Sequence, residues 1–207
     1  MKFYLSSYRI PDTQSFYKFI GKDLSNIKLG LIFNAKDYKS KEEYTQKLFE
    51  TTGYFNNLGI KVEKIELLNY IDKPEDLLNK FKEFDILWFN GGNTYCLRWA
   101  LAESKSEKIL KRALESGVIY GGDSAGAILV GPTLKYYDTA DDPKLAPRAL
   151  YDGLGYIDTA ILPHWGSGEF DHVLGDIEQK LKDDGNKTKR LTNDEYLLIE
   201  NGKVQNI

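Results

Sequence analysis

The sequence predicts an α/β fold: a three-layer sandwich in which helices cover both faces of a mostly parallel central sheet. Short apolar runs alternate with segments of helical periodicity through the first 121 residues. Strands separated by helices in this way pair in parallel, because each crossover helix packs back onto the sheet. Two glycine-rich motifs, at residues 91–94 and 122–126, directly follow apolar runs. In such sheets reactive groups collect at the carboxyl ends of the strands.

The elements are predicted from short apolar runs and from apolar residues at helical spacing. Tyr44, Leu48 and Phe55 fall near one face of the second helix, and Gly59 ends it. Pro74 suits the first turn of the third helix. The predicted strands are residues 3–7, 29–34, 62–67, 86–89 and 118–121, and the predicted helices are residues 13–20, 41–58, 74–81 and 94–116.

After the second glycine motif the regular alternation of strand-like and helix-like segments ends. Residues 131–155 carry three of the six prolines and an acidic cluster, so we expect an excursion over the carboxyl ends of the strands. A short strand at 161–163 and a helix at 170–181 follow. Residues 196–200 and 204–207 form a predicted hairpin around Asn201-Gly202. No repeat or linker divides the chain, so residues 1–207 are predicted to form one domain.

Composition excludes several classes of protein. The 207 residues are 42% hydrophobic and 29% charged, and the net charge is −3 with both signs interspersed, so neither nucleic acid nor an anionic membrane is an expected partner. No apolar run approaches the roughly 20 residues of a membrane span. The single cysteine excludes an internal disulfide framework. We expect a cytoplasmic monomer or homodimer that acts on a small molecule without a cofactor or metal.

The motif Gly122-Asp123-Ser124-Ala125-Gly126 is typical of a nucleophile elbow. It follows an apolar run and precedes small and then apolar residues, as expected where a strand turns sharply into a helix. Side chains two residues before or after the serine would collide with that strand and helix, and glycine avoids this. The alternative is a tight turn that happens to carry a serine.

A serine hydroxyl needs a base beside it at neutral pH, and the chain has two histidines. His164 follows a short apolar run, where a strand end would deliver it to the edge that carries Ser124. His172 falls in a predicted helix, which favours a place on the helix surface. We therefore predict His164 as the base.

The loop after residues 86–89 contains Gly91-Gly92, whose N–H groups can approach a ligand closely. Gly92 and Ala125 are the predicted donors of an oxyanion hole. Asn93 is a candidate for substrate binding and also suits the N-cap of the following helix. A carboxylate should orient the histidine, and the residues themselves leave Asp141, Asp142, Asp194 and Glu195 open.

Four motifs in this order resemble the peptidase E family, the serine peptidases that include α-aspartyl dipeptidase and are related to cyanophycinase. They are Gly-Gly-Asn-Thr at 91–94, Gly-x-Ser-Ala-Gly at 122–126, Gly-Pro-Thr at 131–133 and Pro-His-Trp at 163–165. The resemblance runs over most of the chain. It implies a fold like that of class I glutamine amidotransferases, with serine in place of their cysteine.

The resemblance also implies a Ser-His-Glu or Ser-His-Asp triad, with Ser124 as nucleophile and His164 as base. Two positions depart from the family pattern. Asn193 aligns with the acidic member, so Asp194 or Glu195 would have to serve. Lys135 stands where the aspartyl dipeptidases place an arginine, which keeps the charge but loses bidentate carboxylate binding.

We therefore predict a serine peptidase that cleaves a dipeptide or small peptide-like amide through an acyl-enzyme. N-terminal aspartyl dipeptides are candidate substrates, although Lys135 favours another small peptide. An esterase or acyltransferase that uses the same serine is one alternative, and a degenerate ligand-binding relative is another. A glutaminase that uses Cys96 is disfavoured, because Cys96 falls in a predicted helix that suits a buried apolar role.

Overall fold

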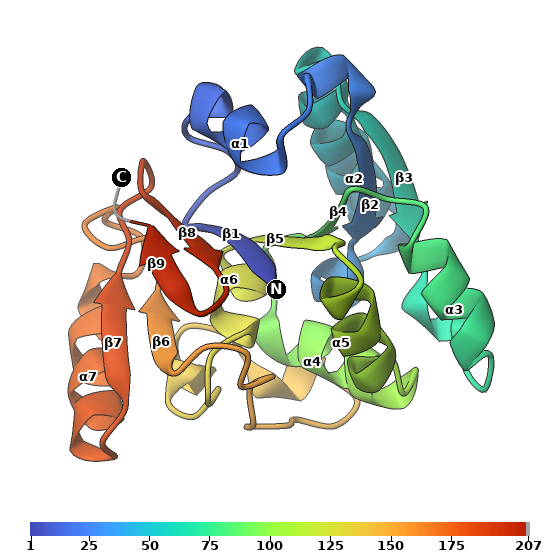
Figure 1. Ribbon diagram of the computed structural model, residues 1–207. Helices are drawn as coiled ribbons and strands as arrows, with labels where there is room; N and C mark the ends of the chain where they lie inside the picture. The colour runs from blue at the N-terminus through green and yellow to red at the C-terminus, as the bar shows by residue number, and fades with distance from the viewer. Residues whose placement is uncertain (206–207) are drawn as a thin grey trace.

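A seven-stranded sheet forms the centre of the protein in a computed structural model that describes residues 1–205 (Figure 1). Its strand order is β3-β2-β4-β5-β1-β8-β9, and the first five of these strands run parallel. The strands are β1 (Lys2–Ser6), β2 (Lys28–Ile32), β3 (Lys61–Ile65), β4 (Ile86–Phe89), β5 (Ile119–Asp123), β8 (Tyr196–Glu200) and β9 (Lys203–Gln205). The antiparallel β8–β9 hairpin extends the sheet beyond β1.

Helices cover both faces of this sheet, so the predicted three-layer α/β fold is confirmed (Figure 1). One face carries α1 (Thr13–Ile20) and α2 (Lys41–Asn57), and the other carries α3 (Pro74–Phe81), α4 (Thr94–Glu103), α5 (Glu107–Glu115) and α6 (Ala125–Leu129). Beside the main sheet, α7 (Asp171–Asp183) packs on a separate parallel pair, β6 (Thr159–Leu162) and β7 (Lys187–Arg190). No helix within residues 1–205 is long and apolar enough to cross a membrane.

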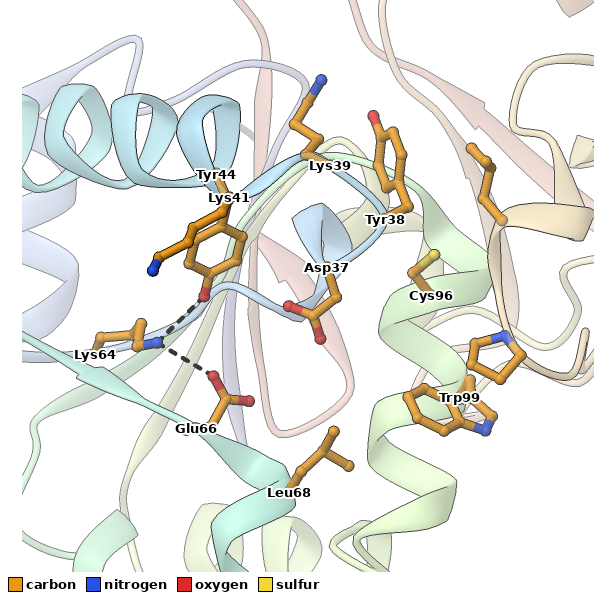
Figure 2. Close-up of a pocket in the computed structure, with 12 residues that line it drawn as sticks. Asp37, Tyr38, Lys39, Lys41, Tyr44, Lys64, Glu66, Leu68, Cys96 and Trp99 are labelled. Atoms are coloured by element: carbon orange, nitrogen blue, oxygen red, sulfur yellow. Dashed lines mark hydrogen bonds and ion pairs between the residues drawn. The ribbon is translucent and has the colours of Figure 1, made fainter.

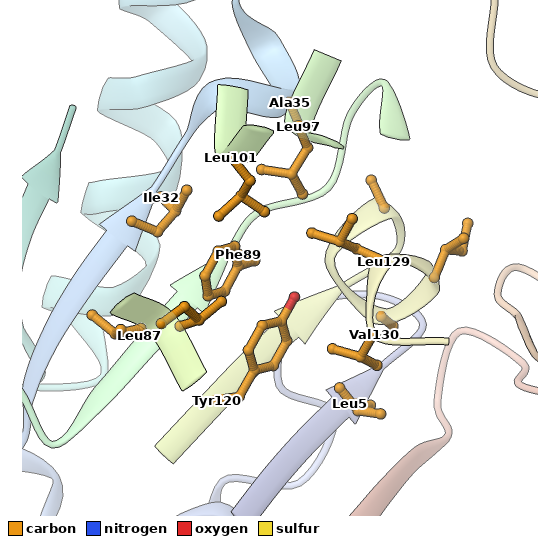
Figure 3. Close-up of a cluster of buried hydrophobic side chains, with 14 of the residues drawn as sticks. Leu5, Ile32, Ala35, Leu87, Phe89, Leu97, Leu101, Tyr120, Leu129 and Val130 are labelled. Carbon is orange, nitrogen blue, oxygen red and sulfur yellow. The ribbon is translucent and has the colours of Figure 1, made fainter. Parts of the chain in front are cut away.

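The two helical layers pack on alternate residues of the strands. In β4, Leu87 and Phe89 point toward α4 and α6, whereas Ile86 and Trp88 join the core under α1 and α2. Figure 3 shows the first of these cores, where Phe89 and Tyr120 lie among leucines from the helices. Their rings stack with centroids 4.4 Å apart. A strand buried on both faces needs such continuous apolar sequence, as β4 has.

Two predicted elements need correction, and one strand was missed. The helix predicted at 94–116 is two helices, because Lys105 adopts a positive φ of 54° and the hydroxyl of Ser104 bonds to the carbonyl oxygen of Ala100. Strand β7 has the polar sequence Lys-Thr-Lys-Arg and was not predicted. The run at 161–163 belongs to β6, which pairs with β7 and not with the main sheet. Residues 206–207 of the predicted hairpin lie outside the described residues.

The segment 131–155 forms the predicted excursion and is anchored by a buried arginine. Arg98, 4% exposed in α4, donates from Nε to the carbonyl oxygen of Asp152 at 2.9 Å. Its Nη2 also meets the Asp152 carboxylate at 2.6 Å. An isolated bridge joins Thr133 to Asp152. These contacts hold the base of the excursion, so that Ala140 and Asp141 near its tip line the same pocket as Ser124.

A buried carboxylate supports the loop that follows β6. Glu178 of α7 is 6% exposed and lies 2.5 Å from Nη2 of Arg190. The guanidinium of Arg190 lies over the ring of Trp165, 3.9 Å from its centroid. The hydrogen bond to Arg190 is the main reason that the pKa of Glu178 falls to about 2, with Lys182 and Thr188 adding to it.

Glu178→Gln is therefore expected to lower the free energy of unfolding at pH 7 by about 1–2 kcal/mol, because it removes a charged hydrogen-bond acceptor. The native pKa lies below the ordinary value, so this contribution is present above about pH 4.5 and is lost as the pH falls toward 2. Urea unfolding at pH 7 and pH 3 measures the difference. Glu75→Gln removes an exposed pair with Arg112 and should change stability by less than about 0.5 kcal/mol. An equal effect of Glu178→Gln at both pH values would contradict this account.

Candidate active site

Ser124 lies at a sharp turn between β5 and α6, with φ at 49° and ψ at −111°. This backbone conformation is rare for a residue with a side chain and occurs where neighbouring structure enforces it. The N–H of Ser124 donates to the carbonyl oxygen of Ser6 at 3.2 Å. A Cβ at Gly126 would overlap the carbonyl oxygen of Phe89, and one at Gly122 would overlap the backbone of Gly126. The two glycines of the motif thus let the turn pack closely against the sheet.

His164 follows β6 and places its Nε2 2.9 Å from Oγ of Ser124. Its φ is 61°, so both partners have left-handed backbone conformations. The N–H of His164 donates to Oγ of Ser7 at 2.7 Å, and the N–H of Trp165 donates to the carbonyl oxygen of Leu191 at 3.0 Å. The structure therefore brings together Ser124 and His164, the nucleophile and base predicted from the sequence.

Asn193 contacts the other ring nitrogen of His164, with its Oδ1 2.8 Å from Nδ1. The hydroxyl of Ser7 donates to the same Oδ1 at 3.2 Å. Since an amide oxygen only accepts, Nδ1 carries the hydrogen and Nε2 is left to accept from Ser124. The antiparallel pairing of β8 with β1, in which the N–H of Ser7 meets the carbonyl oxygen of Glu195, brings Asn193 to this edge.

None of the four candidate carboxylates contacts His164, which corrects the expectation of an acid there. Glu195 accepts at 2.7 Å from the N–H of Thr192 and closes the turn before β8. Asp194 is exposed beside it. Asp142 accepts from the N–H of Lys144 at 2.9 Å. The remaining candidate, Asp141, accepts from both the N–H and the hydroxyl of Thr94, at 2.9 and 2.6 Å.

The glycine loop after β4 reaches the same pocket. Gly92 has a φ of 151° and packs so closely on Ala35 that a Cβ would overlap the Ala35 carbonyl oxygen. The N–H of Asn93 donates to that oxygen at 2.8 Å. Within residues 1–205, the N–H groups of Gly92 and Ala125 donate to no protein acceptor, so both remain candidate oxyanion donors.

The two predicted substrate-binding side chains point elsewhere. Asn93 caps α4 by accepting from the N–H of Cys96 at 3.0 Å, and its Nδ2 donates to the carbonyl oxygen of Asp142 at 2.9 Å. Lys135 lies on the exposed side of the excursion, 3.9 Å from Asp184 of α7, and does not line the pocket. Asn93 therefore caps a helix and Lys135 lies on the outside of the excursion. The prediction that both side chains bind substrate needs correction.

The pocket at Ser124 has a volume of about 490 Å³ and mixed charge. Arg9, Lys36, Asp123 and Asp141 are among its lining residues. Burial raises the pKa of Asp123, opposed by hydrogen bonds from Nε1 of Trp88 at 2.8 Å and from the N–H of Gly91 at 3.2 Å. A pocket of this size and polarity suits a small, charged molecule.

Figure 2 shows a neighbouring cavity of about 570 Å³, with Cys96 on one wall and Tyr38 shared with the serine pocket. The Cys96 side chain is 3% exposed, and burial raises the pKa of its thiol to about 12. A nucleophilic cysteine requires the thiolate. The arrangement is therefore opposite to that of an activated cysteine.

Three residues of the site, Ser7, Lys36 and Asn193, were not predicted from the sequence. Ser7 and Lys36 follow the first two strands of the parallel sheet, where polar side chains of different strands gather. Their place directly after parallel strands could have marked both as candidate site residues. Asn193 was aligned with the acidic member and then passed over for its neighbours, because an amide carries no charge to stabilise an imidazolium.

A model of peptidase family S51 matches residues 7–207. The chain belongs to peptidase family S51. This match covers the serine turn, the glycine loop and the histidine loop together. The family assignment agrees with the resemblance to peptidase E inferred from the four motifs.

Proteins similar to this chain include peptidases from several bacteria. An uncharacterised peptidase of Bacillus subtilis is 30% identical over 163 residues, 78% of this chain and 65% of its own length. An uncharacterised peptidase of Listeria monocytogenes is 29% identical over 122 residues, 58% of each chain. Peptidase E of Nostoc is 25% identical over 147 residues, 70% of this chain and 54% of its own length. The matches thus span about half to two thirds of these relatives.

A solved structure shares the fold. The crystal structure of a Listeria monocytogenes protein provisionally named peptidase E superposes with a TM-score of 0.83. The match covers 99% of this chain and 96% of that one, at 23% identity. The whole arrangement of sheet and helices is therefore common to both proteins.

Gly126→Ala should destabilise the protein by about 2 kcal/mol or more, because its methyl group would overlap the Phe89 carbonyl oxygen and force α6 from β4. Gly175→Ala is the matched control: Gly175 is an exposed residue inside α7 with nothing within 4 Å of its Cβ position. It should stabilise by about 0.5–1 kcal/mol through helix propensity. Thermal unfolding of both variants tests the close approach at the serine turn, and equal melting temperatures would contradict it.

Proposed function

We propose that this protein is a serine peptidase that cleaves a dipeptide or another small peptide-like amide through an acyl-enzyme on Ser124. The observation that carries the proposal is the 2.9 Å contact between Nε2 of His164 and Oγ of Ser124, which line one pocket in a family S51 chain. A nucleophile within hydrogen-bond reach of an oriented base is the arrangement that acyl transfer requires.

In the first half-reaction, Oγ of Ser124 attacks the carbonyl carbon of the scissile amide, and Nε2 of His164 takes the hydroxyl proton. The negative charge that develops on the carbonyl oxygen is stabilised by the N–H groups of Gly92 and Ala125. His164 then donates its proton to the leaving nitrogen, the C–N bond breaks, and the acyl group stays on Ser124. A water molecule releases it by the same steps, with His164 again as base.

In this mechanism Asn193 orients the ring of His164 and, as a neutral amide, adds no charge. Its Oδ1 accepts the hydrogen on Nδ1 of His164, which fixes the ring and keeps Nε2 free to accept a proton. Ser7 keeps the amide oxygen in place by donating to it. This arrangement replaces the Glu or Asp implied by the resemblance. The triad we propose is Ser124, His164 and Asn193.

Small peptides are the proposed substrates because the pocket is limited and carries both signs of charge. Its volume of about 490 Å³ holds a few residues. N-terminal aspartyl dipeptides remain candidates. Lys135 lies outside the pocket, so the difference from the dipeptidase arginine does not count against them.

Ser124→Ala should lower kcat/KM for every dipeptide that the wild type cleaves by at least about a thousandfold, because members of a triad act as a unit. Hydrolysis of a dipeptide library, followed by chromatography of the released amino acids, measures this loss. Ser116→Ala, at the end of α5 near the opposite edge of the sheet, should keep full activity. Full activity of Ser124→Ala would exclude the mechanism, and cleavage of esters but never of dipeptides would favour the esterase alternative.

Changes at Asn193 should rank as Asp above Asn above Ala in kcat. Asn193→Ala removes the acceptor for Nδ1 and should cost about 10- to 100-fold, whereas Asn193→Asp adds a charge that stabilises the imidazolium. The same charge should move the acidic limb of the kcat/KM profile to higher pH. Steady-state kinetics from pH 5 to 9 measures both effects. Equal rates for the wild type and Asn193→Ala would show that Asn193 does not orient the base.

A further inference from the structure

Lys36 lines the serine pocket. It ends the short 3-10 turn Asn34–Lys36, which follows β2. The preceding residue, Ala35, accepts the N–H of Asn93 at 2.8 Å and packs on Gly92. The backbone that carries Lys36 is therefore tied to the loop with the proposed oxyanion donor. Its side chain lines the same cavity as Ser124 and His164.

Lys36 differs from the other two cations of this pocket in having no partner. Lys47 pairs with Glu50 at 2.9 Å. The guanidinium of Arg9 lies over the ring of Tyr54, 4.6 Å from its centroid. Within residues 1–205, the ammonium of Lys36 makes no hydrogen bond or ion pair, although its side chain is half-buried. Burial lowers the pKa of Lys36, because the charged form loses hydration there.

The two carboxylates near Lys36 are held by other groups. Asp123 accepts from Trp88 and Gly91, and Asp141 accepts twice from Thr94. Burial raises the pKa of both carboxylates, and the positive charge of Lys36 opposes that rise, but neither carboxylate forms an ion pair with its ammonium within 4.0 Å. Lys36 thus lines the cavity under attraction from both carboxylates and in contact with neither.

We propose that Lys36 is a specificity-determining residue that forms an ion pair with a carboxylate of the substrate. The inference rests on the proposed function, since it names the substrate feature that the serine pocket selects. A peptide carboxylate would give the ammonium the partner that the protein does not provide. Charge-assisted hydrogen bonds of this kind are about twice as strong as neutral ones.

The carboxylate can come from two parts of a small peptide: the C-terminus or an acidic side chain on the acyl residue. Three probes separate these sources. Asp-Leu has both carboxylates, Asp-leucinamide lacks the C-terminal one, and Asn-Leu lacks the side-chain one. The mixed charge of the pocket, with Asp123 and Asp141 beside Lys36, suits a ligand that also carries an ammonium. All three probes keep that N-terminal ammonium.

Binding is measured first, in the Ser124→Ala background, by titration calorimetry with the three probes. The proposal predicts that adding Lys36→Met raises the Kd of Asp-Leu by about 10- to 100-fold. It also predicts that one of the two single-carboxylate probes loses this dependence on Lys36, which identifies the carboxylate. Lys36→Arg should retain most of the affinity, because it keeps the charge. Lys36→Gln repeats the neutral change with a polar side chain, and melting temperatures confirm that the variants fold.

Lys39→Met is the matched control, since Lys39 lies three residues away on the same segment and lines the neighbouring cavity instead. It should leave the Kd of Asp-Leu unchanged. An equal Kd with and without Lys36→Met, or no binding of any probe at millimolar concentration, would overturn the proposal.

The two proposals fail in different ways. If the Ser124→Ala protein binds Asp-Leu through Lys36 but the wild type cleaves no peptide, the carboxylate site stands and the peptidase mechanism fails. If the wild type cleaves Asp-Leu by Ser124 and Lys36→Met changes neither Kd nor KM, the mechanism stands and the carboxylate site fails.

Discussion

Close contact between backbones at the carboxyl edge of the sheet is the constraint on which this site depends. Gly126 packs on the carbonyl oxygen of Phe89, and Gly92 packs on that of Ala35. The first contact places the serine turn against β4, and the second places the glycine loop against the 3-10 turn that follows β2. Any side chain at these two positions would separate the segments. These contacts therefore fix the relative positions of Ser124, the N–H groups of the glycine loop and Lys36, which ends the turn after β2.

The histidine approaches Ser124 from a part of the chain outside the main sheet. His164 follows β6, which pairs with β7 outside the main sheet, and three contacts bring it to Ser124. Ser7 holds its backbone, Asn193 holds its ring, and the carbonyl oxygen of Leu191 holds the next residue. Because Asn193 is neutral, charge in the pocket comes from the lining residues and not from the third member of the proposed triad. Recognition of a charged substrate is then separate from orientation of the base.

Much of the fold could be predicted because its signals are local. Pro74 marks the start of α3, and α1, α3 and β4 have the predicted bounds. The meeting of Ser124 and His164 was also predicted, although His164 reaches the serine from β6, outside the main sheet, and not from a sheet edge shared with β5. The contact between Asn193 and His164 could not be predicted, because it depends on the register of β8 against β1, a pairing between the two ends of the chain. Strand β7 was missed since its polar residues show no apolar alternation.

The central claim is that Ser124 carries the acyl group during turnover. Mass spectrometry of the protein quenched within milliseconds of mixing with an activated amino-acyl ester tests it most directly, because esters acylate faster than amides and let the intermediate accumulate. The account predicts a mass increase equal to the acyl group, located on the peptide that contains Ser124. Turnover accompanied by an adduct on another residue, such as Cys96, would contradict it.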